Sequence, residues 1–216
     1  VADAALLRDV PHDILVEATG NPKVGYRVAC EAIDAGRHVA MVSKEVDTVA
    51  GVTLSRLAAS RGVVYTTADG DQPANLIGWV SWARTLGLEI IAAGKSGEYD
   101  IVFDPQTGMV RQLDETVSAA ALADLLILGD DIPATLAGRR AALQTLKTSA
   151  TADYCEMAVV ASNTGLVADV EAMHYPVARI AELADIYALR ADGGIIERPG
   201  VIDVFNVLRL PGEASF

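Results

Sequence analysis

The fold of this chain is decided by residues 13–42, which read DILVEATGNPKVGYRVACEAIDAGRHVAMV. A short apolar run ends at Thr19-Gly20, and Asn21-Pro22 then supplies a good N-cap and a proline suited to the first helical position. Apolar residues at helical spacing continue until Gly36, and a second apolar run begins at His38. This stretch therefore predicts a strand, a helix and a second strand.

The same alternation continues to residue 67. A second helix is predicted between Ser43-Lys44-Glu45 and Gly62, and a third strand at 63–67. Strands that alternate with helices at this spacing favour parallel pairing with right-handed crossovers. We therefore predict an α/β protein. Residues 1–73 form the second half of a Rossmann-type parallel sheet, and 74–216 form an α+β catalytic domain that binds the substrate.

The pattern beyond residue 73 is more mixed. The predicted elements are a helix at 73–86, a strand at 88–93, a loop or small hairpin at 98–114, a mainly helical stretch from 116 to 163 with an interruption near 129–133, and a strand at 201–208. Gly94-Lys95-Ser96-Gly97 is predicted to be the turn that follows the strand at 88–93.

Composition excludes several classes of protein. The 216 residues carry a net charge of −12, which argues against a general affinity for nucleic acid or anionic membranes. No uninterrupted apolar stretch reaches the length of about 18 residues that a membrane-spanning helix needs. The two cysteines have no CxxC partner and fit a reducing compartment. We expect a cytoplasmic homo-oligomer that acts on a small-molecule substrate.

Three polar groups fall where predicted parallel strands end, which is where open α/β sheets bind ligands. They are Thr19-Gly20-Asn21, Ser43-Lys44-Glu45 and Gly70-Asp71-Gln72-Pro73. The glycine-rich GxGxxG turn that holds a dinucleotide's phosphates is absent from the sequence. Either this is not a dinucleotide fold, or the chain begins after that half of it. The closeness of the first strand to Val1 favours the second interpretation.

The lysines are the candidates for proton transfer. Hydride transfer to a carbonyl creates an alkoxide, which needs a positive or proton-donating neighbour. Lys44 or Lys95 could supply it, with Asp71 or Glu45 holding the ammonium. We expect Lys44, Asp71 and Lys95 to face one pocket. The alternative is that a lysine at a strand end is an ordinary solvated residue.

The acidic residues and histidines have competing interpretations. Glu45, Asp47 and Asp71 could hold a divalent ion, but we favour a helix cap for Asp47, and a simple turn residue is equally consistent with Asp71. A divalent metal is therefore disfavoured. Glu156 is either a site residue or a salt-bridged surface residue. For His174, a hydrogen-bonded structural role is favoured over that of a catalytic base.

At this point the residues resemble a family. The segment from VEATGNPKVGYRVACEAIDAGRHVAMVSKE through TTADGDQPANLIGW to AAGKSG resembles homoserine-dehydrogenase-like oxidoreductases, closest to the branch with deoxyxylulose-phosphate reductoisomerase-like enzymes. The resemblance continues through EMAVVASNTGLVADVEAMHYP and DVFNVLRLPGEASF. It implies a nucleotide-binding domain, a catalytic domain and a small SAF domain. It also implies that the glycine-rich half belongs before Val1 and that the SAF domain follows Phe216.

The resemblance also implies roles for individual residues. Thr19 and Gly20 match the turn that approaches the nicotinamide ribose, and Gly70-Asp71-Gln72-Pro73 matches the loop that shapes the nicotinamide pocket. Ser43-Lys44 matches an Asn-Lys pair whose lysine serves proton transfer, and Gly94-Lys95 matches a glycine-lysine turn of the reductoisomerase-like branch.

Two departures weaken the match. Ser43 replaces the asparagine of that pair, which counts against homoserine dehydrogenase. Ala150-Thr151-Ala152-Asp153 stands in place of an Asp-Gly-Thr-Lys turn, so a lysine near the substrate is lost.

The sequence thus predicts an NAD(P)-dependent reductase or reductoisomerase for a small polar carbonyl or hydroxy compound, with phosphorylated compounds included. The expected cofactor is NADP or NAD. The predicted catalytic residues are Lys95, Lys44, Asp71, Glu45 and Glu156, and the predicted cofactor-binding residues are Thr19, Gly20, Asn21, Ser43, Lys44, Gln72 and Pro73. Homoserine dehydrogenase is the alternative enzyme. A non-catalytic binding or scaffold protein that keeps the fold is the alternative from another class.

Overall fold

The computed structural model describes residues 4–214, and the chain divides into two compact units. The first unit comprises Val1–Trp79 and Tyr154–Gly165, and the second comprises Val80–Asp153 and Leu166–Phe216. Both contain parallel strands and helices, so the predicted α/β class is confirmed. No helix within the described residues is both long and apolar enough to cross a membrane.

The first unit is built on a three-stranded parallel sheet of order β1-β2-β3. Its elements are the 3-10 helix η1 (Ala4–Asp9), β1 (Ile14–Glu17), α1 (Pro22–Asp34), β2 (His38–Met41), α2 (Lys44–Ser60), β3 (Tyr65–Thr67) and α3 (Gln72–Thr85), which runs on past Trp79. The prediction of three parallel strands joined by helices between residues 13 and 67 is confirmed.

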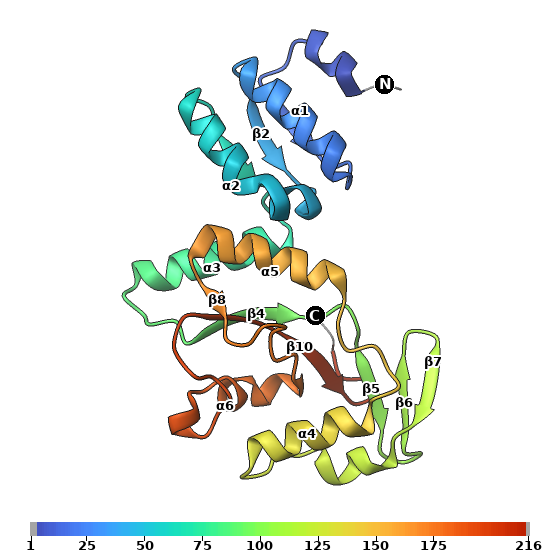
Figure 1. Cartoon of the computed structure of the whole chain (residues 1–216). Coiled ribbons are helices and arrows are strands. Elements are labelled where there is room, and N and C mark those ends of the chain that lie inside the picture. The colour runs from blue at the N-terminus through green and yellow to red at the C-terminus, as the bar shows by residue number, and fades with distance from the viewer. Residues whose placement is uncertain (1–3, 215–216) are drawn as a thin grey trace. The chain divides into compact units, whose positions relative to one another are not determined.

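Side-chain alternation along β1 decides which face of this sheet is covered. Leu15 is buried against α1 and α2, which lie side by side over one face (Figure 1). Ile14 and Val16 point the other way and are 58% and 63% exposed. Side chains on a strand alternate between the two faces of the sheet. At β1, one face is therefore covered by helices, and the other exposes the apolar side chains of Ile14 and Val16.

A buried carboxylate ties α2 to the sheet. Asp47 accepts hydrogen bonds from the Tyr65 hydroxyl at 2.7 Å and the Thr67 hydroxyl at 3.0 Å. Burial, and then the charge of Asp47, raise the pKa of Tyr65. The prediction that Asp47 caps a helix is wrong, since α2 already begins at Lys44 with Ser43 as the N-cap residue. Asp47 is drawn inward because two β3 hydroxyls satisfy its oxygens.

Helix α5 (Thr151–Thr164) contributes Tyr154–Gly165 to the first unit. The Thr48 hydroxyl of α2 donates to the Cys155 carbonyl at 2.9 Å. Gly165 adopts φ +73°, so the predicted helix end at Asn163-Thr164-Gly165 is confirmed.

The second unit is built around β10 (Val201–Arg209), a strand buried along nearly its whole length. Strand order is β4-β10-β5-β6-β7, with β8 and β9 also paired to β10. The other elements are β4 (Ala92–Ser96), β5 (Ile101–Asp104), β6 (Met109–Gln112), β7 (Glu115–Ser118), η2 (Ala120–Leu125), α4 (Ile132–Ala142), β8 (Val167–Ala168), β9 (Val177–Ala178), η3 (Ile180–Glu182), α6 (Leu183–Ile186) and η4 (Arg190–Asp192).

An arginine with no solvent exposure anchors α4. The Arg139 guanidinium donates to both Glu182 oxygens at 2.7 and 2.9 Å and to the carbonyls of Leu125, Leu126 and Val177. Because this planar group needs several acceptors at once, it fixes the segments around it in one arrangement.

Two sequence predictions in the second unit are wrong in position. The strand predicted at 88–93 is β4 at Ala92–Ser96, so Gly94-Lys95 lies in a strand and not in a turn. Pairing with β10, which aligns Ala92 with Val201, outweighs the β-propensity of the Ile and Leu residues before it. Residues 116–118, predicted to be helical, form β7 because they pair with β6. The predicted strand at 201–208 is confirmed.

We predict that Gly94→Ala destabilises the protein. In the β4–β10 pairing, a Cβ at Gly94 would fall 2.2 Å from the backbone oxygen of Asp203, so backbone must shift. Overpacking of this kind costs about 1–3 kcal/mol of unfolding free energy, measured by chemical denaturation. The matched control is Gly78→Ala in α3, where a Cβ meets nothing within 4 Å. It should leave stability unchanged or raise it by up to about 1 kcal/mol. If Gly94→Ala were as stable as the wild type, β4 and β10 would not be packed as closely as the structure shows.

Candidate active site

Predicted cofactor-binding residues lie in the turn after β1 and in the turn after β2, and a hydrogen bond joins the two turns. The amide of Gly20 donates to the Ser43 hydroxyl at 2.8 Å, and the amide of Asn21 donates to the Thr19 hydroxyl at 3.2 Å. Asn21 caps α1 by accepting from the amides of Lys23 and Val24 at 3.1 Å each. The turn is thus held by its own hydrogen bonds, and Thr19 and Gly20 remain exposed at its surface.

A buried glutamate supports this turn from beneath. Glu17 is 2% exposed, and its Oε1 accepts from the Thr19 amide at 2.9 Å. Its Oε2 is buried with no hydrogen-bond partner among the described residues. Gly25 of α1 leaves the space for it, because a Cβ there would lie 2.8 Å from the Glu17 carboxyl carbon. The sequence analysis missed Glu17, although an acid at the end of an apolar strand was a visible signal.

Lys44 begins α2 directly after this turn. Its ammonium pairs with Glu156 of α5, whose side chain is 2% exposed. Both residues were predicted to be catalytic, but their pairing was not, since Asp71 or Glu45 was the expected partner. Lys44 directly follows Ser43 in the chain, and its ion pair joins the start of α2 to α5.

The remaining predicted residues of the first unit have local contacts. The Asp71 carboxylate accepts from the Gln72 amide at 2.8 Å where α3 begins, and Pro73 is buried in the first turn. Glu45 is partly buried in the first turn of α2. Among residues 4–214, Glu45, Asp47 and Asp71 do not form a group of closely spaced ligand atoms.

A cavity of about 450 Å³ also opens in the first unit. Its polar lining comes from the end of β3 and from α2, with Asp47, Ser55, Arg56, Thr67 and Asp69. The predicted residues Lys44, Asp71 and Gln72 are not among its lining residues.

In the second unit, Lys95 lies in a buried polar network. Its ammonium is 2.6 Å from Oδ1 of Asp153, and the two side chains are 9% and 0% exposed. The Tyr175 hydroxyl donates to Oδ2 of the same carboxylate at 3.1 Å. Asp153 therefore holds a lysine ammonium and a phenol on its two oxygens. Whether Lys95 shares a pocket with Lys44 and Asp71 stays a prediction.

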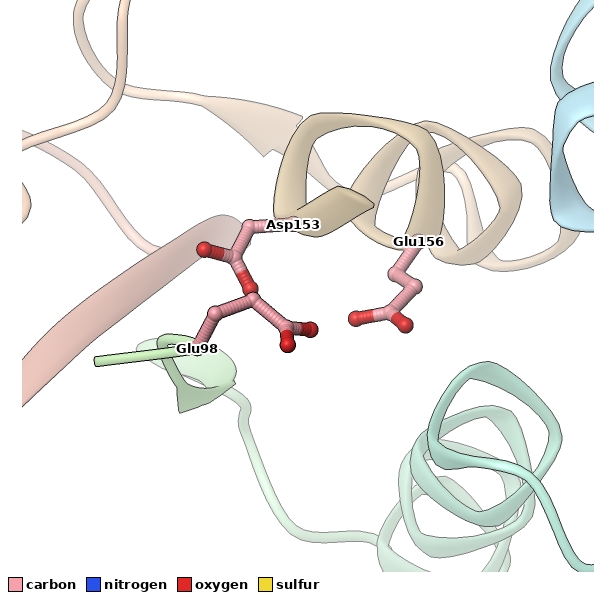
Figure 2. Close-up of side chains that lie close together, drawn as sticks. All are labelled: Glu98, Asp153 and Glu156. Carbon is pink, nitrogen blue, oxygen red and sulfur yellow. The ribbon is translucent and has the colours of Figure 1, made fainter. Parts of the chain in front are cut away.

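A further carboxylate of the second unit, that of Glu98, lies near this network (Figure 2). Glu98 is 3.9 Å from the Lys95 ammonium and is partly exposed. Asp153 and Glu156 are three residues apart in α5 and project from one side of that helix. The Lys95 ammonium balances the charge of Asp153, so this carboxylate has a partner without a metal ion.

Tyr175 is positioned by a strained turn. Met173 and Tyr175 have φ of +58° and +47°, which non-glycine residues seldom adopt. The Asp203 carboxylate of β10 holds the turn by accepting from the amides of His174 and Tyr175, at 2.9 and 3.1 Å. Burial raises the pKa of Asp203, against the lowering effect of these donors. Strain of this kind persists only where the surroundings enforce it, and it concentrates at functional sites.

The sequence analysis missed Asp153, Tyr175 and Asp203 as functional residues. Asp203 had a readable signal, since it is a charged residue inside the apolar strand VIDVFNVL. Asp153 and Tyr175 had none, because only the fold brings them to Lys95.

His174 lies on the same turn, and its Nε2 is 3.0 Å from Oδ2 of Asp169. The ring is therefore hydrogen-bonded, which is the role that the sequence analysis favoured for it. Asp169 also accepts from the Glu197 amide at 3.1 Å. Burial acts to raise the pKa of Asp169, but these donors outweigh it, and the pKa lies below its usual value of 3.8.

We predict that this pair stabilises the protein above pH 4 or so and stops doing so in acid. A carboxyl whose pKa is lowered by folding contributes stability above its unfolded pKa and loses it as pH falls through the folded pKa. Asp169→Asn should cost about 1–2 kcal/mol at neutral pH, and the gap to wild type should close in acid. Urea denaturation from pH 7 to pH 3 measures both. Asp130→Asn, at an exposed loop position, should change stability by less than about 0.5 kcal/mol. A gap independent of pH would show that the charge of Asp169 is not responsible.

The comparisons with known proteins bear on the later part of the second unit and on the whole of α5. Residues 130–212 match the family model described as Oxidoreductase DRL, catalytic domain. No curated protein matches the chain. The matched residues are fewer than half of the chain but include Asp153, His174, Tyr175 and Asp203. The match supports a general oxidoreductase function for this protein.

Proposed function

We propose that this protein is an NAD(P)-dependent reductase or reductoisomerase that acts on a small polar carbonyl or hydroxy compound, phosphorylated compounds included. The observation that carries the proposal is the network of Lys95, Asp153 and Tyr175. Two of its three members lie in the stretch that matches an oxidoreductase catalytic domain.

Lys95 is the proposed proton donor. Reduction of a carbonyl carbon leaves an alkoxide on its oxygen, and the ammonium can protonate that oxygen as it forms. The lysine side chain is 9% exposed, so little water screens the ammonium from a neighbouring negative charge. In the reverse direction, the neutral amine would take the proton from the hydroxyl of an alcohol substrate.

Asp153 and Tyr175 are the proposed positioning residues. The carboxylate holds the ammonium in one place at 2.6 Å, and the Tyr175 hydroxyl occupies its second oxygen. An ammonium fixed before the reaction does not have to reorganise as charge develops, which is the main source of electrostatic catalysis.

The turn at Thr19 and Gly20 is the proposed contact for the nicotinamide end of the cofactor. When bound, the nicotinamide supplies or accepts the hydride. Gly20 has φ +63° and no side chain, so a flat ring or ribose can approach its backbone closely. The Asn21 side chain already caps the first amides of α1. This helix end is therefore suited to a ribose or a ring and not to the pyrophosphate.

Lys44 and Glu156 are the proposed second proton-transfer pair. Lys44 follows Ser43, whose hydroxyl accepts from the Gly20 amide, and its ammonium pairs with Glu156. A reductoisomerase must move protons in its rearrangement step as well as in reduction, and a second lysine–carboxylate pair would serve that need.

The test is a variant of Lys95. Consumption of NADH and NADPH should be followed with a panel of small carbonyl and hydroxy compounds, phosphorylated and not, including homoserine. Lys95→Met should lower kcat by about 10²–10⁴-fold if the ammonium donates the proton, and should leave cofactor affinity little changed. The matched control is Lys147→Met, because Lys147 is an exposed lysine of the same unit that lies over the Tyr99 ring.

Two results would contradict the proposal. If neither NADH nor NADPH bound the full-length wild-type protein saturably, it would not be an NAD(P) enzyme. If Lys95→Met lowered the melting temperature but kept the wild-type kcat, the buried pair would serve stability alone.

A further inference from the structure

The second unit contains a cavity of about 970 Å³ whose lining is unusual in charge. It lies between α4, the segment Val170–Val177 and the segment Arg190–Ile195. Its lining includes Arg140, Arg190, His174 and Gln144, and no aspartate or glutamate. The chain as a whole carries a net charge of −12, so a hollow whose charged lining residues are all arginines is a local exception. A volume of this order suits a small-molecule ligand.

Both arginines are held in place but keep donors for a ligand. Arg140 donates to the His174 carbonyl at 2.6 Å, and no other described residue accepts from it. Arg190 donates to the Ile195 carbonyl at 3.3 Å and pairs with Glu197 at 3.2 Å. A guanidinium has five N–H donors, so each group retains several that can reach an anion.

His174 adds a polar ring of fixed orientation. Its Nε2 is 3.0 Å from Oδ2 of Asp169, whose side chain is 2% exposed. A carboxylate that holds one ring nitrogen fixes the plane of the imidazole. The ring is among the residues that line the cavity.

The backbone that carries His174 is strained on both sides, at Met173 and Tyr175. A buried carboxylate, Asp203, enforces this conformation by accepting from the His174 and Tyr175 amides. Such an arrangement is costly, and it fixes the backbone that carries the His174 ring.

We propose that this cavity binds a small molecule that carries an oxyanion, as a phosphate ester or a carboxylate. Arg140 and Arg190 provide charge-assisted hydrogen bonds to its oxygens, and the His174 ring lies beside them in the lining. The site is independent of hydride transfer, and it stands whether or not Lys95 donates a proton.

Histidine-ring NMR tests the proposal directly. The chain has three histidines, and His12 and His38 lie in the first unit, so they serve as internal controls. Inorganic phosphate and succinate are titrated separately at constant ionic strength, with sodium chloride as the blank. A saturable shift of the His174 ring signals is expected with at least one probe, while the His12 and His38 signals stay unchanged.

Arginine variants locate the site. Arg140→Gln and Arg190→Gln should each raise the dissociation constant about tenfold or more, since each removes a charged donor. Arg61→Gln is the control, because Arg61 is an exposed arginine of the first unit with a carboxylate partner, Asp34. Unchanged His12 and His38 signals in each variant show that the first unit remains folded, and circular dichroism with a melting curve checks the second.

The outcomes are distinct. Saturation by phosphate alone identifies a phosphate ester as the ligand class, and saturation by succinate alone identifies a carboxylate. The proposal is overturned if neither probe shifts the His174 ring more than chloride does. It is equally overturned if both arginine variants, correctly folded, bind as tightly as wild type.

Discussion

The second unit depends on the burial of one carboxylate, that of Asp203. It lies in the middle of β10, a strand that pairs with β4, β5, β8 and β9, and it is 1% exposed. A charge in this position is tolerated only because backbone amides satisfy its oxygens. Two of those amides belong to the turn at Met173–Tyr175, so the same contacts that make the buried charge tolerable hold that turn in its left-handed conformation. The conformation of the turn therefore depends on the position of Asp203 in the sheet.

Local signals explain why the first unit could be predicted so closely. Asn21-Pro22, Gly36 and Gly62 mark where helices begin and end, and each lies where the structure has those boundaries. The strands of the second unit were harder to predict, because their positions are set by pairing with β10, which lies far along the chain. The position of β4 follows from its pairing with Val201–Phe205, which local propensity does not contain.

The candidate site shows the same division. Local patterns and the family resemblance singled out Lys44, Lys95 and Glu156, although Lys95 lies within β4 and not in the predicted turn. Their partners could not be predicted in this way, since Lys95 and Asp153 are brought together by the fold alone. Spacing along the chain predicts which groups are present at a site, and only tertiary packing decides which of them touch.

The two lysine pairs differ in a way that bears on chemistry. The Lys44 side chain is 24% exposed and the Lys95 side chain 9%, although both are held by well-buried carboxylates. Coulombic interactions strengthen as water is excluded, so Lys95 exerts the larger effect on a nearby charge. Lys44 is the more accessible of the two to solvent, which would suit the second proton-transfer role proposed for it.

The strained turn has one more consequence, because its adjacent residues serve different places. The His174 ring lines the basic cavity, and the Tyr175 hydroxyl holds Asp153 beside Lys95. A backbone fixed by one carboxylate has few ways to move, so a displacement at one residue is transmitted to the next. An effector bound at the cavity and a substrate bound at Lys95 would therefore be thermodynamically linked. Such linkage is reciprocal, so each ligand would change the affinity of the other by the same factor.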